Sequence, residues 1–309
     1  MKLIMNPGSR SGKSRKLWKV WESGLRSEGL AFESIVTGGL GDAFRICRQL
    51  TGEDTAVAVG GDGTINEVLD GVVQSGNPRL KMGVLYSGTS PDFCRFHGIP
   101  TNPEKALRCL IAGNVKRVDV ARIEYSLENG KKCTAHFGCG CNIGLGASVA
   151  RSANQMRRFL GDCLGTGLAA VKAIMKSDPV DLDLDIDGVH RSFAKVNNIS
   201  ILKSPYIASG LKLNVDLKPD DGRLMLAALS GLSRRGLCSV LPGFYTGNAV
   251  DSQAVSLTQC ERVSIRAAGR QEIEFDGDPR CCLPAAIQIL PKALTLILHQ
   301  SACNIQVLV

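Results

Sequence analysis

VGGDGTINE, from Val59 to Glu67, is a glycine-rich turn with an acid in it, and it lies between an apolar segment and an amphipathic one. The preceding run TAVAV, from Thr55 to Val59, has the length and β-branched content of a short buried strand. The apolar residues downstream recur with helical spacing at Ile65, Val68, Leu69 and Val72. We therefore predict that this turn joins a strand to a helix.

The chemistry of this turn suits a polyphosphate. Its glycines let the main chain approach a ligand closely, and the helix start offers N–H groups and the positive end of the helix dipole. Asp62 carries the wrong charge to bind phosphate, so we assign it to a magnesium ion or a proton. The alternative is a tight turn without a ligand, which is the ordinary interpretation of a lone Asp-Gly pair.

Three more loops follow predicted strands in the first 125 residues. Lys2 to Met5 is followed by Asn6, Pro7, Gly8, Ser9 and Arg10; Phe32 to Val36 is followed by Thr37; and Lys81 to Tyr86 is followed by Ser87, Gly88 and Thr89. Alternating strands and helices are typical of a parallel sheet, whose ligands bind beyond the carboxyl ends of the strands. A shared nucleotide explains four such loops better than four unrelated turns do.

Length and composition indicate a globular protein with two domains. The chain has 309 residues, of which 44% are hydrophobic, and single cores rarely grow beyond ~250 residues. We place an α/β ATP-binding domain at 1–122 and a second domain at 123–309, whose last residues pack back on the first. No segment is long and apolar enough to span a membrane, and the N-terminus lacks the apolar region of a signal peptide, so we expect the protein in the cytoplasm.

The charge balance restricts the partners. The net charge of +8 favours phosphates, anionic lipid or nucleic acid, with clusters from Arg10 to Lys19 and at Arg151, Arg157 and Arg158. Aromatic residues make up only 5% of the chain, too few for the stacking platforms of single-strand binding, so we expect no nucleic-acid partner. An anionic membrane surface or a nucleotide is favoured, and an ordinary solvated basic face is the alternative.

The second half predicts successive strands, beginning with Val180 to Ile186, where apolar residues alternate with Asp181, Asp183 and Asp185. We interpret these acids as solvent-facing and Asp187-Gly188 as a turn. Further strands are predicted at 194–202, 211–217, 223–229, 263–267, 271–275 and 285–290, which together suggest a β-sandwich. A helical insertion at about 148–175 carries an apolar stripe of Leu160, Leu164, Leu168, Val171, Ile174 and Met175, which packs on the sandwich or touches lipid.

Two acidic turns end strands in this half, Asp220-Asp221-Gly222 and Asp276-Gly277-Asp278. An Asp-Gly pair between strands is ordinarily a hairpin. Phosphoryl transfer, however, needs a carboxylate to orient or deprotonate the acceptor hydroxyl, and metal ions to neutralise the phosphate oxygens. The first domain offers only Asp62 and Glu67 near its loops, so these turns are candidates for the missing acids.

Taken in order along the chain, these motifs resemble the soluble bacterial diacylglycerol kinases and their relatives, the sphingosine and ceramide kinases. The resemblance rests on Asn6-Pro7 with Ser11-Gly12, Thr37 with Gly41-Asp42-Ala43, Gly60 to Val68, Gly88-Thr89 with Asp92-Phe93 and Arg95, Arg117 to Val120, and the two acidic turns. The Gly-Gly-Asp-Gly-Thr block also occurs in NAD kinases and phosphofructokinases. The later acidic turns favour the lipid branch.

The resemblance implies a Rossmann-like α/β domain followed by a β-sandwich, with ATP between the domains. It implies that one set of residues holds the nucleotide: Asn6, Pro7, Gly8, Ser9, Arg10, Thr37, Gly60, Gly61, Asp62, Gly63, Thr64, Ile65, Asn66, Glu67, Gly88 and Thr89. Asp62 would act near the transferred phosphate. Asp221, with the main-chain oxygens of Lys218 and Arg223, would hold a structural Mg²⁺. Asp276 or Asp278 would take the proton from the lipid hydroxyl.

Two residues depart from the family pattern. Pro91 stands where the family has Asn, so an amide side chain and a backbone N–H are both lost. Asp278 stands where the family has Glu, and its shorter side chain turns a direct contact into a water-mediated one.

Our leading hypothesis is an ATP- and Mg²⁺-dependent kinase of a membrane lipid, diacylglycerol giving phosphatidic acid, that docks transiently at the inner membrane surface. The alternatives are an NAD kinase-like enzyme and a catalytically silent lipid- or nucleotide-binding regulator. The acceptor lipid, and whether the chain forms a homodimer, stay open.

Overall fold

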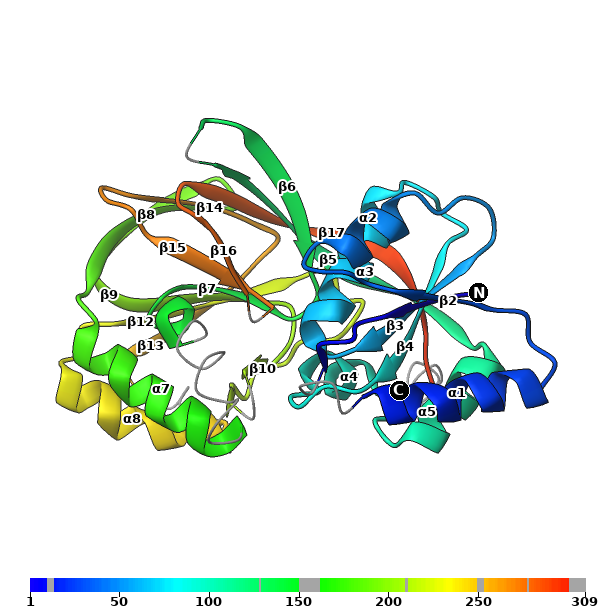
Figure 1. The fold of residues 1–309 in the computed structure, drawn as a ribbon. Helices are drawn as coiled ribbons and strands as arrows, with labels where there is room; N and C mark the ends of the chain where they lie inside the picture. Colours follow the sequence, from blue (N-terminus) through cyan, green and yellow to red (C-terminus); the bar gives the residue numbers. More distant parts are fainter. Residues whose placement is uncertain are drawn as a thin grey trace, which may run out of the picture. The chain divides into compact units, whose positions relative to one another are not determined.

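A computed structural model describes residues 1–9, 14–127, 129–149, 162–208, 211–248, 253–276 and 278–299 (Figure 1). The chain divides into two compact units. Unit 1 comprises Met1–Asp119 together with the segment from Pro291 onward, and unit 2 comprises Val120–Leu290. Two long strands, β5 (Val115–Ser126) and β17 (Ala285–Ile297), each begin in one unit and end in the other.

Unit 1 is built on a parallel sheet with strand order β17-β4-β3-β1-β2. Its other strands are β1 (Lys2–Met5), β2 (Glu33–Val36), β3 (Thr55–Gly60) and β4 (Lys81–Tyr86). Their short apolar runs are buried almost throughout in β1, β3 and β4, as expected for strands covered on both faces. All four strands predicted from the sequence in this half are present within one residue of their predicted limits.

Helices cover both faces of this sheet (Figure 1). They are α1 (Arg15–Ser27), α2 (Asp42–Arg48), α3 (Asp62–Gln74), α4 (Asp92–His97) and α5 (Pro103–Ala112). Trp21 and Leu25 of α1 and Leu110 of α5 pack against Leu3 and Val57 of the sheet. The opposite face carries α3, and α2 packs closely on α3 because Gly71 has no side chain: a Cβ there would lie only 2.7 Å from the Cys47 Cβ.

The register of the strands brings their carboxyl ends to one edge. Met5 of β1 lies opposite Val36 of β2 and Val59 of β3. Gly60 of β3 in turn lies opposite Tyr86 of β4. The loops that begin at residues 6, 37, 61 and 87 therefore leave the sheet together, as the sequence pattern predicts.

Unit 2 consists mainly of antiparallel strands around one apolar core. Its strands are β6 (Lys132–Phe137), β7 (Gly140–Gly144), β8 (Val180–Ile186), β9 (Val189–Leu202), β10 (Tyr206–Ala208), β11 (Leu211–Lys212), β12 (Leu224–Ser230), β13 (Val255–Cys260), β14 (Arg262–Ala267), β15 (Glu272–Phe275) and β16 (Asp278–Cys282). The long strand β9 pairs with β7, β8 and β12. Phe137, Ile201 and Phe275 are fully buried in the core.

The alternating segment of unit 2 folds as predicted. β8 and β9 form a hairpin whose turn residues Asp187 and Gly188 both have positive φ, the geometry that Asp-Gly favours. Leu182 and Leu184 are buried while Asp181 and Asp183 are exposed. The acids make local hydrogen bonds: Asp181, for instance, accepts one from the Lys195 N–H.

One predicted strand, 211–217, is mostly wrong. Only Leu211–Lys212 pairs as a strand, with β10. The next backbone N–H groups bond elsewhere, because Leu213 donates to the Pro205 carbonyl and Asn214 to the Gly247 carbonyl. Leu213 and Leu217 are nonetheless buried. Their alternating pattern therefore indicates buried side chains, although the segment forms no strand pairing beyond Lys212.

Two helices of unit 2 pack on each other, α7 (Asp162–Lys176) and α8 (Arg234–Thr246) (Figure 1). The helix α8 was not predicted from the sequence. The predicted apolar stripe of the insertion divides between two faces of α7: Ile174 is buried against Leu237 of α8, whereas Leu168, Val171 and Met175 are exposed. Leu160, Arg151, Arg157 and Arg158 lie outside the described residues. Among the described helices, none has the length and apolar character that membrane crossing requires.

Candidate active site

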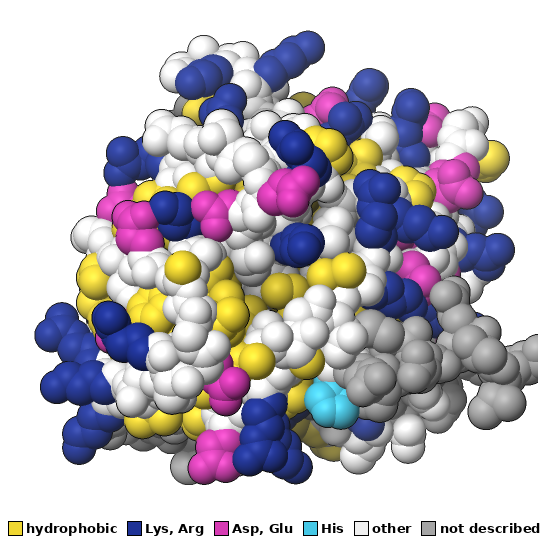
Figure 2. Space-filling view, turned by 90° about the vertical axis from the view of Figure 1, so that its right-hand side faces the viewer, with side chains coloured by type: hydrophobic (Ala, Val, Ile, Leu, Met, Phe, Trp, Pro, Cys, Tyr) yellow, Lys and Arg dark blue, Asp and Glu magenta, His cyan; other side chains and the backbone are white. Residues whose placement is uncertain are grey.

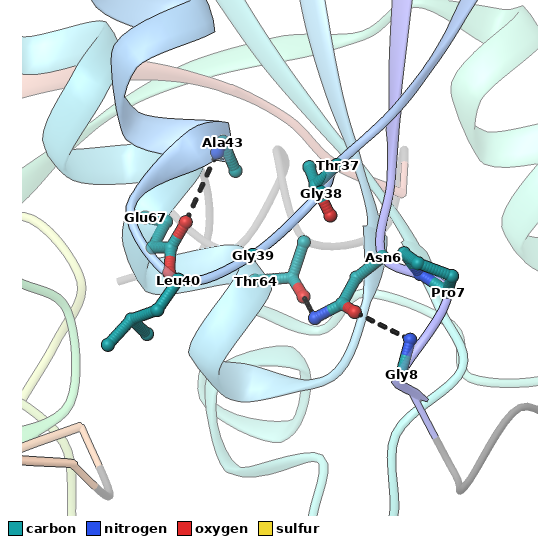
Figure 3. A pocket seen from close by; sticks show the side chains of 10 residues that line it. All are labelled: Asn6, Pro7, Gly8, Thr37, Gly38, Gly39, Leu40, Ala43, Thr64 and Glu67. Atoms are coloured by element: carbon teal, nitrogen blue, oxygen red, sulfur yellow. Dashed lines mark hydrogen bonds between the residues drawn. The ribbon is translucent and has the colours of Figure 1, made fainter.

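A pocket of about 390 Å³ lies at the carboxyl edge of the unit 1 sheet (Figure 3). It is lined by Asn6, Pro7, Gly8, Thr37, Gly38, Gly39, Leu40, Ala43, Thr64 and Glu67. These residues come from the loops after β1 and β2 and from the N-terminal parts of α2 and α3. The volume lies in the range of ligand sites, and most of the lining is backbone and small side chains.

Asn6 joins two sides of this pocket. Its Nδ2 donates to the Thr64 hydroxyl oxygen at 2.9 Å, and its Oδ1 accepts the Gly8 N–H at 2.8 Å (Figure 3). The side chain thus fixes its own loop to the first turn of α3. The two hydrogen bonds also use both ends of the amide, which fixes its orientation.

Glu67 lies one turn further along α3 and is buried. Its carboxylate accepts the Gly41 N–H at 2.9 Å and the Ala43 N–H at 3.2 Å. Both donors belong to the start of α2, where a carboxylate is stabilised by the helix dipole. Glu67 therefore shapes the pocket wall by holding the loop between β2 and α2.

The first turn of α3 is well suited to an anion. The residue before the helix is Gly61, which has no side chain to cap the helical N–H groups. A Cβ on Gly88 would lie only 2.5 Å from the Gly61 Cα. The loops after β3 and β4 therefore touch through two glycines, and larger residues would push them apart.

Asp62 is the first residue of α3 and is partly exposed. Its Oδ2 accepts the Tyr86 hydroxyl at 3.1 Å, and its Oδ1 lies 3.5 Å from the Phe93 N–H. Burial, and next the charge of Asp62, raises the pKa of Tyr86 far above its usual value. Tyr86 therefore keeps its proton and acts as a donor to Asp62.

The loop after β4 ends at Pro91, the residue before helix α4. Pro91 precedes α4, where a missing N–H costs little, and its carbonyl accepts the Arg95 N–H at 2.9 Å. The Ser90 hydroxyl donates to Asp92, which Arg95 also contacts. The departure at Pro91 is thus compatible with an ordered helix start.

The predicted nucleotide residues separate into three groups. Asn6, Pro7, Gly8, Thr37, Thr64 and Glu67 line the pocket. Ser9, Gly60, Gly61, Asp62, Gly63, Ile65, Asn66, Gly88 and Thr89 lie at the end of β3, in the loops after β1, β3 and β4 or in the first two turns of α3, but they are not part of the lining. Arg10 lies outside the described residues. The sequence reasoning did not single out Gly38, Gly39 and Leu40, although two glycines directly after a predicted strand end are a usable signal.

In unit 2, Asp276 follows β15 with a positive φ of 48°. Its carboxylate accepts three backbone N–H groups, from Gly138 at 2.8 Å, Cys139 at 2.9 Å and Gly140 at 3.0 Å. The loop between β6 and β7 is thereby wrapped around one carboxylate. Asp278 begins β16 opposite Phe275, and its side chain lies outside the described part of the structure.

The predicted metal residues enclose a lysine. The Lys203 ammonium donates to the Lys218 carbonyl at 2.7 Å and to Asp221 Oδ1 at 2.5 Å, and it lies 3.4 Å from the Arg223 carbonyl. These are the three oxygens that the resemblance assigns to Mg²⁺. With an ammonium among them, they do not fit a divalent cation, since like charges repel strongly at such distances.

Comparison with known proteins gives the family. The diacylglycerol kinase catalytic domain family matches residues 1–123, and the YegS C-terminal NAD kinase beta sandwich-like domain family matches residues 140–298. A diacylglycerol kinase of Mycobacterium tuberculosis is 27% identical over 297 residues, which cover 95% of this chain and 93% of the relative. A Citrobacter koseri protein named "probable lipid kinase YegS-like" is 30% identical over 278 residues, or 87% of each chain. The chain belongs to the diacylglycerol kinase and YegS family of lipid kinases.

Solved structures confirm the predicted fold class, an α/β nucleotide-binding domain followed by a β-sandwich. A proposed diacylglycerol kinase from Bacillus anthracis has a TM-score of 0.77 at 21% identity, covering 97% of both chains. Yeast NADH kinase has a TM-score of 0.56 at 12% identity, and the match covers 99% of this chain and 86% of the yeast chain. At such identities the likeness concerns the fold alone.

Proposed function

We propose that the protein transfers the γ-phosphate of ATP to the hydroxyl of a membrane lipid, with diacylglycerol as the acceptor and phosphatidic acid as the product. The pocket at the carboxyl edge of the unit 1 sheet is the observation that carries this proposal, because it combines a volume suited to a nucleotide with the uncapped first turn of α3. Membership of a lipid kinase family supports the acceptor class.

The nucleotide would use two parts of this pocket. Leu40 lines it with a side chain that is 83% exposed, which offers an apolar surface to a purine base. The first turn of α3, with Thr64, offers N–H groups and a hydroxyl to the phosphates. Mg²⁺ bound to the ATP phosphates would neutralise their charge, and Asp62 in the same turn is the carboxylate suited to face it. Within the described residues, no group of three acidic, His or Cys side chains forms a metal site by itself.

The two acids of the last turn would have different roles. Asp276 already accepts three N–H groups, so its carboxylate is committed to holding the loop between β6 and β7. We assign Asp278 as the group that takes the proton from the lipid hydroxyl. The hydroxyl oxygen then bonds to the γ-phosphorus while the bond to the β–γ bridging oxygen breaks, which leaves ADP and the phosphorylated lipid.

Membrane contact would use the exposed ridge of α7. Leu168, Val171 and Met175 lie at i, i+3 and i+7, and they are 49%, 44% and 58% exposed. Lys172 and Lys176 are exposed on the same helix. Apolar side chains beside lysines on one helix suit the surface of an anionic membrane. The face shown in Figure 2, by contrast, carries Lys and Arg side chains interspersed with acids, as an ordinary solvated surface does.

The test is a phosphorylation assay with labelled ATP, Mg²⁺ and anionic vesicles that contain diacylglycerol. We expect labelled phosphatidic acid, and a loss of rate on the order of 10²-fold or more in Asp278→Asn with unchanged ATP affinity. Asp178→Asn is the matched control, since Asp178 is 90% exposed. Parallel reactions with ceramide, with sphingosine and with soluble NAD identify the acceptor. Labelled NADP would contradict the proposal, as would ATP binding without turnover of any lipid.

The membrane contact is tested separately by vesicle sedimentation. Leu168→Ser with Met175→Ser should weaken binding to anionic vesicles at least about tenfold, because two apolar side chains no longer enter the interface. Val20→Ser is the control, since Val20 is 52% exposed on α1. Equal losses in both proteins would remove α7 as the docking helix.

A further inference from the structure

Lys203 is a lysine with a fully buried side chain, 0% exposed, directly after β9. A buried charge is costly unless it is paired and hydrogen-bonded. Its ammonium has three N–H donors, and three oxygens surround it: the carbonyls of Lys218 and Arg223 and one carboxylate oxygen of Asp221. The cation is therefore coordinated by the turn from residue 218 to residue 223.

Asp221 completes this turn from the inside. Its carboxylate also accepts the Lys218 N–H at 2.8 Å and the Arg223 N–H at 3.1 Å. Burial by itself raises the pKa of Asp221, but the hydrogen bonds from Lys203 and from these two N–H groups outweigh it, so the pKa lies below its usual value. The carboxylate is thus charged at neutral pH and compensates the ammonium.

A magnesium ion would need the place that the ammonium holds. Mg²⁺ binds oxygen ligands at about 2.0–2.1 Å in octahedral geometry. The ammonium already lies 2.5 Å from Asp221 Oδ1 and 2.7 Å from the Lys218 carbonyl oxygen. We propose that Lys203 is a built-in cation that takes the place of a divalent metal ion in the Asp221 turn, so that unit 2 folds and keeps this turn without a structural metal.

The same lysine is connected to the loop around Asp276. The backbone N–H groups of Lys203 and Ser204 both donate to the Cys139 carbonyl, at 2.9 and 3.0 Å. The Cys139 N–H donates to Asp276. One peptide segment thus receives hydrogen bonds from the Lys203 segment and gives one to Asp276, so the built-in cation and the candidate acid belong to one connected network.

The experiment measures thermal unfolding without nucleotide, first on the unchanged protein. Its melting temperature should stay within about 1 °C on chelation and on addition of millimolar Mg²⁺ or Mn²⁺, because no metal binds the folded state in this turn. A rise with Mg²⁺, a fall with chelator, or one tightly bound divalent ion per chain in elemental analysis would overturn the proposal. The readout is independent of catalysis, so it stands apart from the kinase assay.

Two variants test the replacement directly. Lys203→Met keeps the stem and removes the charge, and it should lower the melting temperature by roughly 5–10 °C because Asp221 loses its partner. Lys203→Ala opens the space, and its melting temperature should rise by several degrees with millimolar Mg²⁺. Lys132→Met, on an exposed lysine of β6, is the control and should change neither value.

Either of two results with these variants would overturn the proposal: a Lys203→Met protein as stable as the original, or a Lys203→Ala protein indifferent to every divalent ion. If Lys203→Ala is recovered only as aggregate, its refolding yield from denaturant with and without Mg²⁺ replaces the melting temperature. The double variant Lys203→Met with Asp221→Asn should recover part of the lost stability, since it leaves no unpaired charge.

Discussion

The glycine turn at the start of α3 in unit 1 and the Asp221 turn in unit 2 look alike in sequence, because each places aspartate beside glycine. In the structure they differ. The α3 turn borders a pocket, and Asp62 there accepts the Tyr86 hydroxyl and lies 3.5 Å from the Phe93 N–H. The Asp221 turn encloses the Lys203 ammonium and is closed to a ligand. An aspartate in such a turn therefore either faces a ligand site, as Asp62 does, or pairs with a cation of the protein itself, as Asp221 does.

The difference follows from what each turn lacks. The α3 turn has glycine at position 61 and leaves the helical N–H groups without a side-chain cap, so it needs an anion from outside. The Asp221 turn directs two carbonyl oxygens and a carboxylate inward, so it needs a cation, and the chain supplies one. The first arrangement is a binding site, and the second is a structural element.

The largest effects are expected when each of the two aspartates is replaced by asparagine. Asp62→Asn should lower the rate of phosphoryl transfer on the order of 10²-fold or more, since the turn loses its negative charge, while unfolding free energy changes by less than about 1 kcal/mol. Asp221→Asn should do the reverse and destabilise the fold by about 2–4 kcal/mol because the buried ammonium loses its counter-charge. Steady-state kinetics and urea unfolding on both variants measure the two effects. If Asp62→Asn proves the more destabilising variant, the contrast is wrong.

The next largest effect is expected where Gly61 and Gly88 approach each other closely beside the α3 turn. Gly88→Ala should weaken ATP binding about tenfold and destabilise the fold by about 1–3 kcal/mol, because its Cβ would lie 2.5 Å from the Gly61 Cα. Gly269→Ala is the matched control: Gly269 is not part of the pocket lining, and a Cβ there meets nothing within 4 Å. Calorimetric titration with ATP compares them. Equal effects in both variants would show that Gly88 is not a close-contact position.

Much of this contrast could be predicted from the sequence, and part of it could not. Strand ends, the α3 turn and Asn6 follow from local patterns, because a parallel sheet brings successive carboxyl ends to one edge. The role of Lys203 could not be predicted. It lies 18 residues before Asp221 and directly after a strand, where a lysine is ordinarily exposed, and only the tertiary fold turns its side chain inward. The three N–H groups that bind Asp276 are likewise more than 130 residues away from it along the chain.

A smaller effect concerns how the Asp221 turn contributes to the free energy of unfolding at low pH. The pKa of Asp221 is lowered in the folded protein, so its stabilisation is fully present above the usual value of 3.8 and is lost as the pH falls through the lower folded-state pKa. The difference in unfolding free energy between the original protein and Asp221→Asn should therefore be constant from pH 7 to about pH 5 and shrink below about pH 4. Urea unfolding across this range measures it. A difference that grows on acidification would contradict the assignment of the Asp221 charge.

The smallest effect is expected at Tyr86, a side-chain donor to Asp62 in the α3 turn. Tyr86→Phe removes the hydroxyl that donates to Asp62 at 3.1 Å and keeps the ring that is buried behind it. One neutral donor to a partly exposed carboxylate is worth about 1 kcal/mol. We therefore expect the rate of phosphoryl transfer to fall about fivefold, with little change in melting temperature. Because the raised pKa of Tyr86 keeps its proton in place, the effect should be the same at pH 7 and pH 9. A rate ratio that varies between these pH values would instead assign a titrating role to Tyr86, and two groups beside the α3 turn, Asp62 and Tyr86, would then change protonation.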